Sequence, residues 1–227
     1  MLSIVSTPIG NLGDITLRAM DTLRNCDAIV CEDTRVAGKL LALLGLPKKE
    51  LISFHGYSDP RKVDAILARL RRSERLCLVS DAGTPCISDP GYALVAAARK
   101  ADMKIEVVPG PSAFLAALSA SGLPINRFTY FGFLPLKKGR ATLLQSLRKE
   151  ERTVVFYESP HRIERTLLDL AVALGDQPDR RIVVARELTK LHEETLTFTI
   201  RDVGTALMKL TIKGEFVIVI SAAPSAD

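Results

Sequence analysis

The sequence predicts an α/β protein with two α/β domains, the first built on a mostly parallel five-strand sheet and the second on a mixed sheet. Three observations point to this class. Short apolar runs alternate with amphipathic stretches along the chain. Glycine- and proline-containing turns follow several of these runs directly, as they do at the carboxyl ends of parallel strands. The 227 residues, 47% of them hydrophobic, suffice for one large core or two small ones.

Five apolar runs in the first half are predicted to form the first sheet, at 2–6, 27–32, 51–54, 75–79 and 104–108. Helices are expected between and after them, at 34–44, from 60 onward, at 92–100 and at 113–121. A further helix is expected after the first strand, with Asp14 as its cap. That cap would turn Ile15, Leu17, Met20 and Leu23 toward the core.

Turn residues at 121–127 (SGLPINR) indicate a domain boundary, so the domains are expected to span 1–121 and 122–227. Beyond the boundary, strands are predicted at 128–133, 153–157, 181–186, 195–200 and 215–220, with long helices at 138–150 and 160–174. Two helices are too few to connect all these strands in parallel. The segments 188–200 and 216–221 could pair antiparallel, which predicts the mixed sheet.

The segment Ser80–Gly91 (SDAGTPCISDPG) joins a predicted strand to a predicted helix, at the sheet edge where α/β proteins bind ligands. Gly83 would let a ligand approach the backbone, and Asp81 offers a fixed hydrogen-bond acceptor. Asp89, followed by Pro90, is predicted to cap the next helix. The alternative is a well-capped connection that binds nothing.

Charged residues cluster after other predicted strands, in EDTR (32–35), YESPHR (157–162) and ELTKLHEE (187–194). Each of these clusters could also be an ordinary solvated surface. The basic segment PLKKGR is suited to phosphate contact through Lys137, Lys138 and Arg140, although lysines before a helix are more often plain surface residues.

Composition excludes several classes of protein. The net charge of +5 permits a phosphate-bearing partner without requiring one. The four cysteines have no CxxC spacing and the three histidines lie in separate segments, so buried thiols and no metal site are expected. No signal sequence or membrane-length apolar run is seen, which predicts a cytoplasmic protein. The absence of a Walker lysine and of GxGxxG argues against nucleoside triphosphate hydrolysis and a dinucleotide fold.

Seven segments together resemble the tetrapyrrole-methylase-like superfamily: TPIGNLGDIT, EDTR, SDAGTPCISDPG, VPGPSA, YESPHR, ELTK with HEE, and KGEFVIVI. Within it the chain is similar to the branch that methylates a cytidine 2′-hydroxyl in the decoding region of 16S rRNA. The resemblance runs over residues 2–221. It implies S-adenosyl-L-methionine as cofactor, held in a cleft between the domains, 16S rRNA or the 30S subunit as substrate, and a homodimer.

The resemblance also implies site residues. The implied cofactor-binding residues are Pro8, Gly10, Asp81, Ala82, Gly83, Thr84, Ser112, Ala113 and Tyr157. Asp33 and His55 match the positions of a base and an acid proposed for porphyrin-modifying relatives. The remaining catalytic candidates are Arg35, Glu158 and His161. The first glycine loop and the DAGTP loop depart from the GPGD and GDP patterns of those relatives, which favours the RNA branch.

A ribose hydroxyl is a weak nucleophile, so a base or hydrogen-bond acceptor should help as its proton leaves. Asp33 is the first candidate and Glu158 the second, a neutral His55 or His161 could do the same, and Arg35 could orient Asp33 or hold a phosphate. Two other functions stay open. One is methylation of a small tetrapyrrole by the same fold, and the other is a non-catalytic RNA-binding module.

Overall fold

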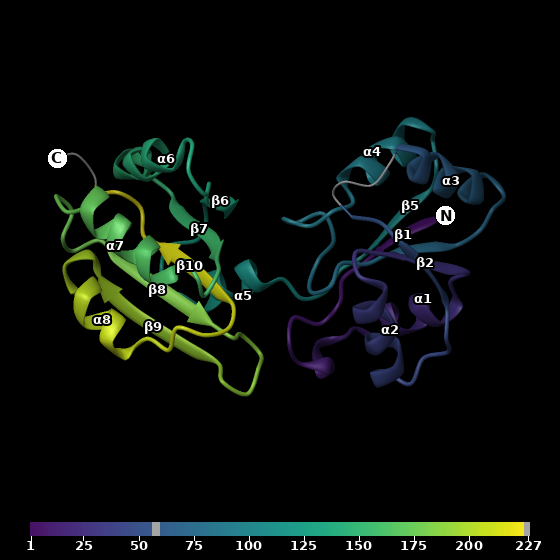
Figure 1. Ribbon diagram of the computed structural model, residues 1–227, viewed down its shortest axis with the longest axis horizontal. Coiled ribbons are helices and arrows are strands. Elements are labelled where there is room, and N and C mark those ends of the chain that lie inside the picture. Colours follow the sequence, from purple (N-terminus) through teal and green to yellow (C-terminus); the bar gives the residue numbers. More distant parts are fainter. Residues whose placement is uncertain (56–59, 225–227) are drawn as a thin grey trace. The chain divides into compact units, whose positions relative to one another are not determined.

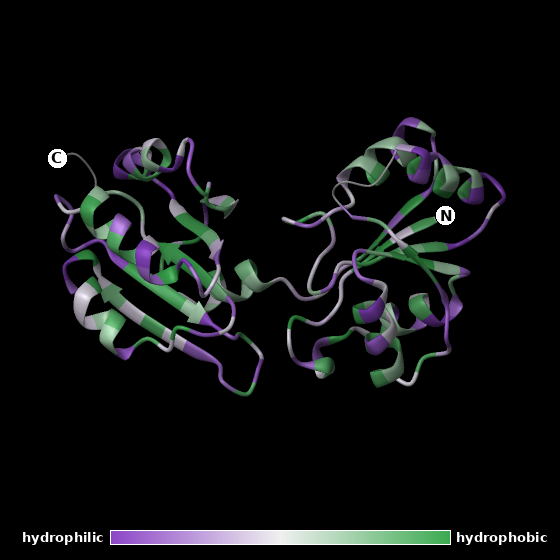
Figure 2. Ribbon diagram, in the orientation of Figure 1, coloured by the Kyte–Doolittle hydropathy of each residue, from purple (hydrophilic) through white to green (hydrophobic). Residues whose placement is uncertain are grey.

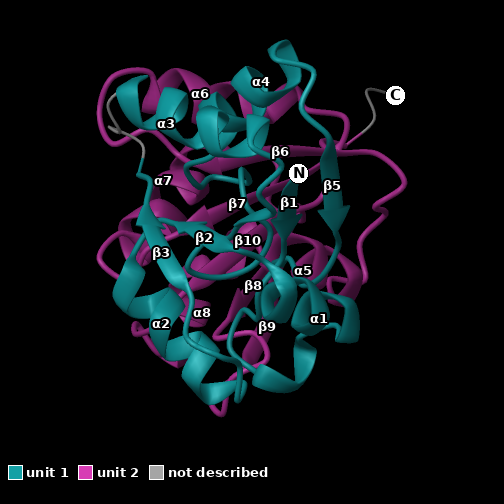
Figure 3. Cartoon of the chain, turned by 90° about the vertical axis from the view of Figure 1, so that its right-hand side faces the viewer, with its two compact units in different colours: residues 1–112 teal, residues 113–227 magenta. Residues whose placement is uncertain are grey.

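The computed structural model of the chain describes residues 1–55 and 60–224. It divides into two compact units, Met1–Ser112 and Ala113–Asp227, shown in teal and magenta in Figure 3. The predicted fold class is confirmed, because each unit contains a five-stranded sheet with helices packed on it. The units divide nine residues before the boundary expected after Ser121, since the helix that precedes Ser121 packs within the second unit.

Unit 1 is built on a fully parallel sheet with the strand order β3-β2-β4-β1-β5. Its strands are β1 (Leu2–Val5), β2 (Ala28–Cys31), β3 (Glu50–Ser53), β4 (Leu76–Leu78) and β5 (Ile105–Val108). All residues of β2 and β4 are buried, as expected for parallel strands with both faces covered. In the centre of the sheet β1 and β4 are neighbours, with Ser3 opposite Cys77.

Two helices cover each face of this sheet. The helices are α1 (Leu17–Asn25), α2 (Thr34–Leu43), α3 (Pro60–Arg71) and α4 (Tyr92–Lys100). The first two pack on one face, where Leu23 and Leu41 join a cluster with Val5. The other two pack on the opposite face, where Ile66 and Leu94 join a second cluster. The connections after β1 and β4 therefore leave neighbouring strands toward opposite faces, which opens a crevice at their carboxyl ends.

Two helix caps in unit 1 differ from the sequence prediction. Asp14 ends a short 3₁₀ turn (η1, Leu12–Asp14), and the Thr16 hydroxyl caps α1 by accepting from the Ala19 amide at 3.1 Å. Leu17, expected in the core, is consequently 86% exposed. Asp89 does not cap α4, because Gly91 occupies the cap position with a φ of 134°.

Unit 2 contains the predicted mixed sheet, in the order β6-β7-β10-β8-β9 (Figure 1). Its strands are β6 (Phe128–Phe133), β7 (Thr153–Glu158), β8 (Arg181–Arg186), β9 (Glu194–Thr199) and β10 (Phe216–Ile220). Only β6 and β7 pair in parallel. The expected pairing of β9 with β10 is wrong, because β8 lies between them and pairs with both. Every residue of β10 is buried, which suits the central position of that strand.

The helices of unit 2 lie on both faces of its sheet. One face packs against α6 (Arg140–Ser146), α7 (Ile163–Ala173) and α8 (Val203–Lys209), and 3₁₀ turns follow α6 (η2, Leu147–Lys149) and precede α8 (η3, Ile200–Asp202). The opposite face packs against α5 (Ala113–Ala120), which contacts β7 and β10. Figure 2 shows hydrophobic strands in both units next to helices of mixed polarity. The sequence did not predict α8, which is only seven residues long.

The four cysteines are free thiols, and Cys26, Cys31 and Cys77 are buried, as expected from the sequence. Within residues 1–55 and 60–224, no cluster of histidine, cysteine or carboxylate side chains has the arrangement of a metal site. The helices in these same ranges are too short or too polar to span a membrane.

Candidate functional site

The loops that follow the five strands of unit 1 all emerge at one edge of the sheet, because the strands are parallel. This edge, called here the carboxyl edge, carries most of the predicted site residues. Pro8 and Gly10 follow β1, Asp33 follows β2 and His55 follows β3. The residues 81–84 follow β4, and Ser112 lies after β5.

The loops after β1 and β4 are joined by an isolated antiparallel bridge between Thr7 and Gly83. The Thr7 amide donates to the Gly83 carbonyl at 2.9 Å, and the Gly83 amide donates to the Thr7 carbonyl at 3.1 Å. Both residues are buried. The bridge fixes the two loops at the crevice where the helices diverge.

Side-chain hydroxyl groups connect the loop after β5 to the loops after β1 and β4. The Thr84 hydroxyl donates to the Pro111 carbonyl at 3.1 Å and lies 3.0 Å from the Ser6 hydroxyl. Because Thr84 has one hydroxyl proton, Ser6 is the donor in the second bond. Gly110 packs so closely on Ser6 that an added Cβ would stand 2.9 Å from the Ser6 Cβ. Three neighbouring loops are thus one connected structure.

Gly83 has a left-handed backbone with a φ of +80°, which favours glycine. An added Cβ would also stand 3.3 Å from Ile9 Cγ2 and 3.6 Å from the Pro111 carbonyl oxygen. The glycine predicted from the sequence is therefore required by the loop itself. Next to it, Asp81 and Ala82 are exposed at the carboxyl edge.

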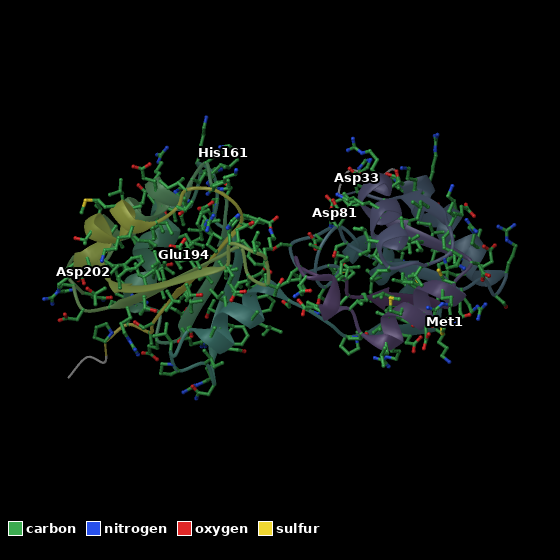
Figure 4. All side chains as sticks on the ribbon, turned by 90° about the horizontal axis from the view of Figure 1, so that it is seen from below. Met1, Asp33, Asp81, His161, Glu194 and Asp202 are labelled. Atoms are coloured by element: carbon green, nitrogen blue, oxygen red, sulfur yellow. The ribbon has the colours of Figure 1, made fainter. Side chains whose placement is uncertain are left out.

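Asp33 is the N-cap of α2, where its carboxylate accepts the Arg35 amide at 2.8 Å. The Arg35 guanidinium binds the same carboxylate, at 2.6 Å from Nη2 to Oδ2 and 3.0 Å from Nε to Oδ1. These bonds lower the pKa of Asp33 to about 2. The Asp33 amide donates to Asp81 Oδ1 at 3.2 Å, and the two residues lie side by side in Figure 4. The structure thus brings together the predicted residues Asp33, Arg35 and Asp81.

Two further carboxyl groups at this edge are protonated more easily than usual. Burial raises the pKa of Asp89 to about 6, against a hydrogen bond from Ser80 that lowers it. Burial and the Asp81 charge raise the pKa of Glu32, and the neighbouring charge of His55 lowers it. His55 therefore lies within electrostatic reach of this group of carboxylates.

The remaining predicted residues belong to unit 2. Tyr157 lies on β7, edge-on to Tyr130 with ring centroids 5.7 Å apart, and its ring centroid is 5.5 Å from that of Phe133. His161 is exposed in the turn before α7 (Figure 4). Ala113 begins α5 at the point where the chain passes from unit 1. The cofactor cleft expected between the domains stays a prediction.

Glu158 is buried, and its carboxylate is occupied by neighbouring groups. Oε1 accepts the Ser159 amide at 2.9 Å, and Oε2 accepts the Thr166 hydroxyl at 2.6 Å. Arg162 adds an ion pair at 3.4 Å. These contacts give Glu158 a role in holding the turn before α7, and its catalytic role stays a prediction.

Arg140, predicted to contact phosphate with Lys137 and Lys138, has a side chain only 9% exposed. Its guanidinium donates to Asp169 at 3.1 Å and to the Thr166 hydroxyl at 2.9 Å. The predicted phosphate contact is therefore wrong for Arg140. Its guanidinium instead joins α6 to α7 through these two hydrogen bonds. Lys137 and Lys138 are exposed.

Sequence reasoning missed three polar residues of the carboxyl edge: Ser6, Thr7 and Asp89. Ser6 and Thr7 directly precede Pro8, so their position at a strand end was the available signal. The Asp89-Pro90 pair predicts only a helix cap at Asp89. Its partial burial, which raises the pKa, depends on the packing of the loop and has no signal in the sequence.

A family model described as Tetrapyrrole (Corrin/Porphyrin) Methylases matches residues 1–204. A protein of Xylella fastidiosa named Ribosomal RNA small subunit methyltransferase I is 48% identical over 229 residues, covering 100% of this chain and 83% of the relative. A protein of Thermotoga maritima with the same name is 44% identical over 220 residues, covering 97% of both.

Solved structures of methyltransferases share the fold at low sequence identity. Cobalt precorrin-4 methyltransferase, a cobalamin biosynthetic enzyme, has a TM-score of 0.71 at 20% identity, covering 97% of this chain and 94% of the other. Uroporphyrin-III C-methyltransferase of Thermus thermophilus, in complex with S-adenosyl homocysteine, has a TM-score of 0.66 at 18% identity, covering 97% and 96%.

Proposed function

The chain belongs to the tetrapyrrole (corrin/porphyrin) methylase family, and from this we propose that it is an S-adenosylmethionine-dependent methyltransferase acting on small-subunit ribosomal RNA. One observation carries the proposal. Relatives that are 44% and 48% identical over at least 97% of this chain bear the name Ribosomal RNA small subunit methyltransferase I. The likeness to porphyrin and corrin enzymes, at 18–20% identity, supports the fold alone.

The carboxyl edge of unit 1 suits the proposed cofactor. The Gly83 turn has a left-handed backbone, and a Cβ there would press on Ile9, while Asp81 and Ala82 stay exposed beside it. Asp81 uses Oδ1 for the Asp33 amide, and a carboxylate has further acceptor capacity for ribose hydroxyls. We propose that Pro8, Gly10, Asp81, Ala82, Gly83, Thr84, Ser112, Ala113 and Tyr157 hold the cofactor.

The cofactor, when bound, supplies an electrophilic methyl group on a sulfonium. The chain has to align the acceptor hydroxyl with it, and alignment of this kind contributes several kcal/mol, up to about 7–11 in well-oriented cases. The chain must also hold or accept the proton of that hydroxyl. The fixed bonds between the loops after β1, β4 and β5 give the carboxyl edge the rigidity that alignment requires.

Asp33 is our proposed partner for the hydroxyl proton, with Arg35 as the residue that orients it. Its pKa of about 2 makes it a permanent hydrogen-bond acceptor at neutral pH and a weak proton acceptor. Asp89, with a pKa of about 6, is better matched to taking up a proton and is the second candidate. We rank Glu158, His55 and His161 below these two as candidates for holding or accepting the hydroxyl proton.

The acceptor group, the oligomeric state and the cellular location are proposed from the family resemblance of the sequence. We propose that the acceptor is the 2′-hydroxyl of a cytidine in the decoding region of 16S rRNA, and that the protein works as a homodimer in the cytoplasm. The net charge of +5 suits a polyanionic substrate.

A substrate comparison tests the proposal. The protein is incubated with radiolabelled S-adenosylmethionine and, separately, with 30S particles, naked 16S rRNA and a porphyrin mixture. Label in rRNA from either RNA arm supports the proposal, and label in the porphyrin alone contradicts it. Calorimetric titration with S-adenosylmethionine separates an enzyme from an RNA-binding module, because the latter would show no cofactor binding.

A further inference from the structure

A groove of about 560 Å³ opens between α6 and α7, entirely within unit 2. Its volume falls in the range of about 300–1,000 Å³ that is typical of small-ligand sites. Leu136 and Val172 stand on its walls and are 73% and 84% exposed, while Leu144 at its base is buried. The groove is therefore large enough for a small ligand and has an apolar wall.

Cations outnumber carboxylates around this groove. Lys137, Arg140 and Arg165 line it together with a single carboxylate, Asp169. Asp169 lies 3.1 Å from Arg140 Nε and 3.9 Å from Arg165 Nε, so it pairs more closely with Arg140. Arg165 has a side chain that is 81% exposed. Lys137 is exposed and forms no salt bridge with any of the residues that the structure describes. Lys137 and the guanidinium of Arg165 are therefore both accessible to a ligand.

The base of the groove is a fixed structure. Arg140 is more than nine-tenths buried, and its guanidinium is held by Asp169, by the Thr166 hydroxyl at 2.9 Å and by the Pro135 carbonyl at 3.4 Å. Thr166 in turn donates to Glu158, so the groove is connected to the turn that follows β7. Gln145 adds an exposed amide, which can both donate to and accept from a base edge.

We propose that this groove binds one unstacked nucleotide of the RNA substrate, with its phosphate against Lys137 and Arg165 and its base against the apolar wall. RNA-binding proteins stack unpaired bases on aromatic rings or on arginine guanidinium planes, and the exposed Arg165 offers such a plane in the same groove. The excess of cations favours a polyanion over a protein segment as the occupant. The inference rests on the proposed function and adds to it a contact site for single-stranded RNA.

The test compares two groove variants with a matched control. Lys137→Gln/Arg165→Gln removes the two available cations, and Ala141→Glu places a negative charge at an exposed groove position on α6. Lys149→Gln/Lys209→Gln removes the same charge from exposed positions of unit 2 that do not line the groove. Binding of a short single-stranded RNA from the decoding region is followed by fluorescence anisotropy across a series of salt concentrations.

We expect both groove variants to lose about tenfold in RNA affinity. For the double variant, the slope of log affinity against log salt should fall by about 0.7, since both cations contact the same phosphate and each phosphate contact to a single strand contributes about 0.7. Cofactor affinity should stay at the wild-type value, and KM for rRNA should rise while kcat is kept. A groove double variant with the affinity and slope of the control would overturn the inference.

Three further results separate the inference from the proposed function. Tight binding of free cytidine monophosphate that the groove variants abolish would assign the groove to a free nucleotide and overturn the inference. Loss of 30S binding with unchanged oligonucleotide affinity would assign it to a ribosomal protein, with the same consequence. A wild-type protein that methylates no rRNA, with groove variants that still lose oligonucleotide binding, would contradict the proposed function and support the groove.

Discussion

Thr7 and Gly83 pair with each other through two backbone hydrogen bonds, of 2.9 and 3.1 Å, across the loops that follow two neighbouring parallel strands. The pairing is possible because Gly83 adopts a φ of +80°. It holds the candidate cofactor loop against the first loop of the chain. The conformation of one glycine thus links the fold of unit 1 to its proposed site.

Gly83→Ala should weaken S-adenosylmethionine binding by about tenfold, because the added methyl contacts Ile9 and shifts the paired loops. It should also lower stability by about 1 kcal/mol, the cost of a left-handed backbone at a non-glycine residue. Isothermal titration calorimetry and urea unfolding measure the two effects.

Gly45→Ala is the control for backbone strain. Gly45 has a φ of +64°, and an added Cβ there would have nothing within 4 Å. This variant should lose similar stability and keep full cofactor affinity. Equal cofactor affinity in the two variants would remove the Gly83 loop from the cofactor site.

Asp33→Asn should lower the single-turnover rate of methyl transfer by about 10²-fold or more, because asparagine has no negative charge to attract the hydroxyl proton and cannot take that proton. Helix α2 should persist, since asparagine is as good an N-cap as aspartate. Asp21→Asn, which removes an exposed partner of Arg24 on α1, should leave the rate unchanged. An Asp33→Asn rate within about threefold of wild type would exclude the role proposed for Asp33.

The pH dependence of the rate distinguishes Asp33 from Asp89. With a pKa of about 2, Asp33 stays ionised from pH 5 to 8. If Asp33 is the partner of the hydroxyl proton, the rate should therefore stay constant over that range. With a pKa of about 6, Asp89 would be protonated below pH 6 and the rate would fall there. A single-turnover profile that breaks near pH 6 in the wild type, and is flat in Asp89→Asn, would transfer the role to Asp89.

The raised pKa of Asp89 also predicts how the stability of the fold depends on pH. Its folded pKa of about 6 lies above the ordinary 3.8, so the folded chain binds the proton more tightly and stability falls as pH rises from about 4 to 6. Since the carboxyl is partly exposed, we expect Asp89→Asn to gain about 1–2 kcal/mol at pH 7. Urea unfolding at pH 5 and 7 measures this, and a variant no more stable than wild type at pH 7 contradicts it.

Glu158 can be tested for a structural role through its partner Thr166. Thr166→Val keeps the side-chain volume and removes the hydroxyl that donates to Glu158 and accepts from Arg140. Both Thr166→Val and Glu158→Gln should cost about 1–3 kcal/mol, the penalty for buried groups that lose hydrogen-bond partners. If the rate per folded molecule falls in Glu158→Gln and not in Thr166→Val, Glu158 has a catalytic role.

The strands and the loops at their carboxyl ends could be predicted from the sequence. The helix caps and the buried charged side chains could not. Apolar runs such as Phe216–Ile220 leave little choice other than a central strand. Asp14 and Thr16 are both acceptable caps, and only the packing of the loop decides between them. Arg140 looks like any other basic residue of PLKKGR, and its burial depends on Asp169 and Thr166, which are distant in sequence.

The central claim, methyl transfer to a ribose of small-subunit rRNA, is tested most directly by identifying the labelled nucleoside. The protein is incubated with 30S particles and S-adenosylmethionine carrying a deuterated methyl group, and the rRNA is digested and analysed by mass spectrometry. The account predicts deuterium in 2′-O-methylcytidine from the 16S rRNA. Label on a base, or no label in rRNA while the protein binds S-adenosylmethionine, would contradict it.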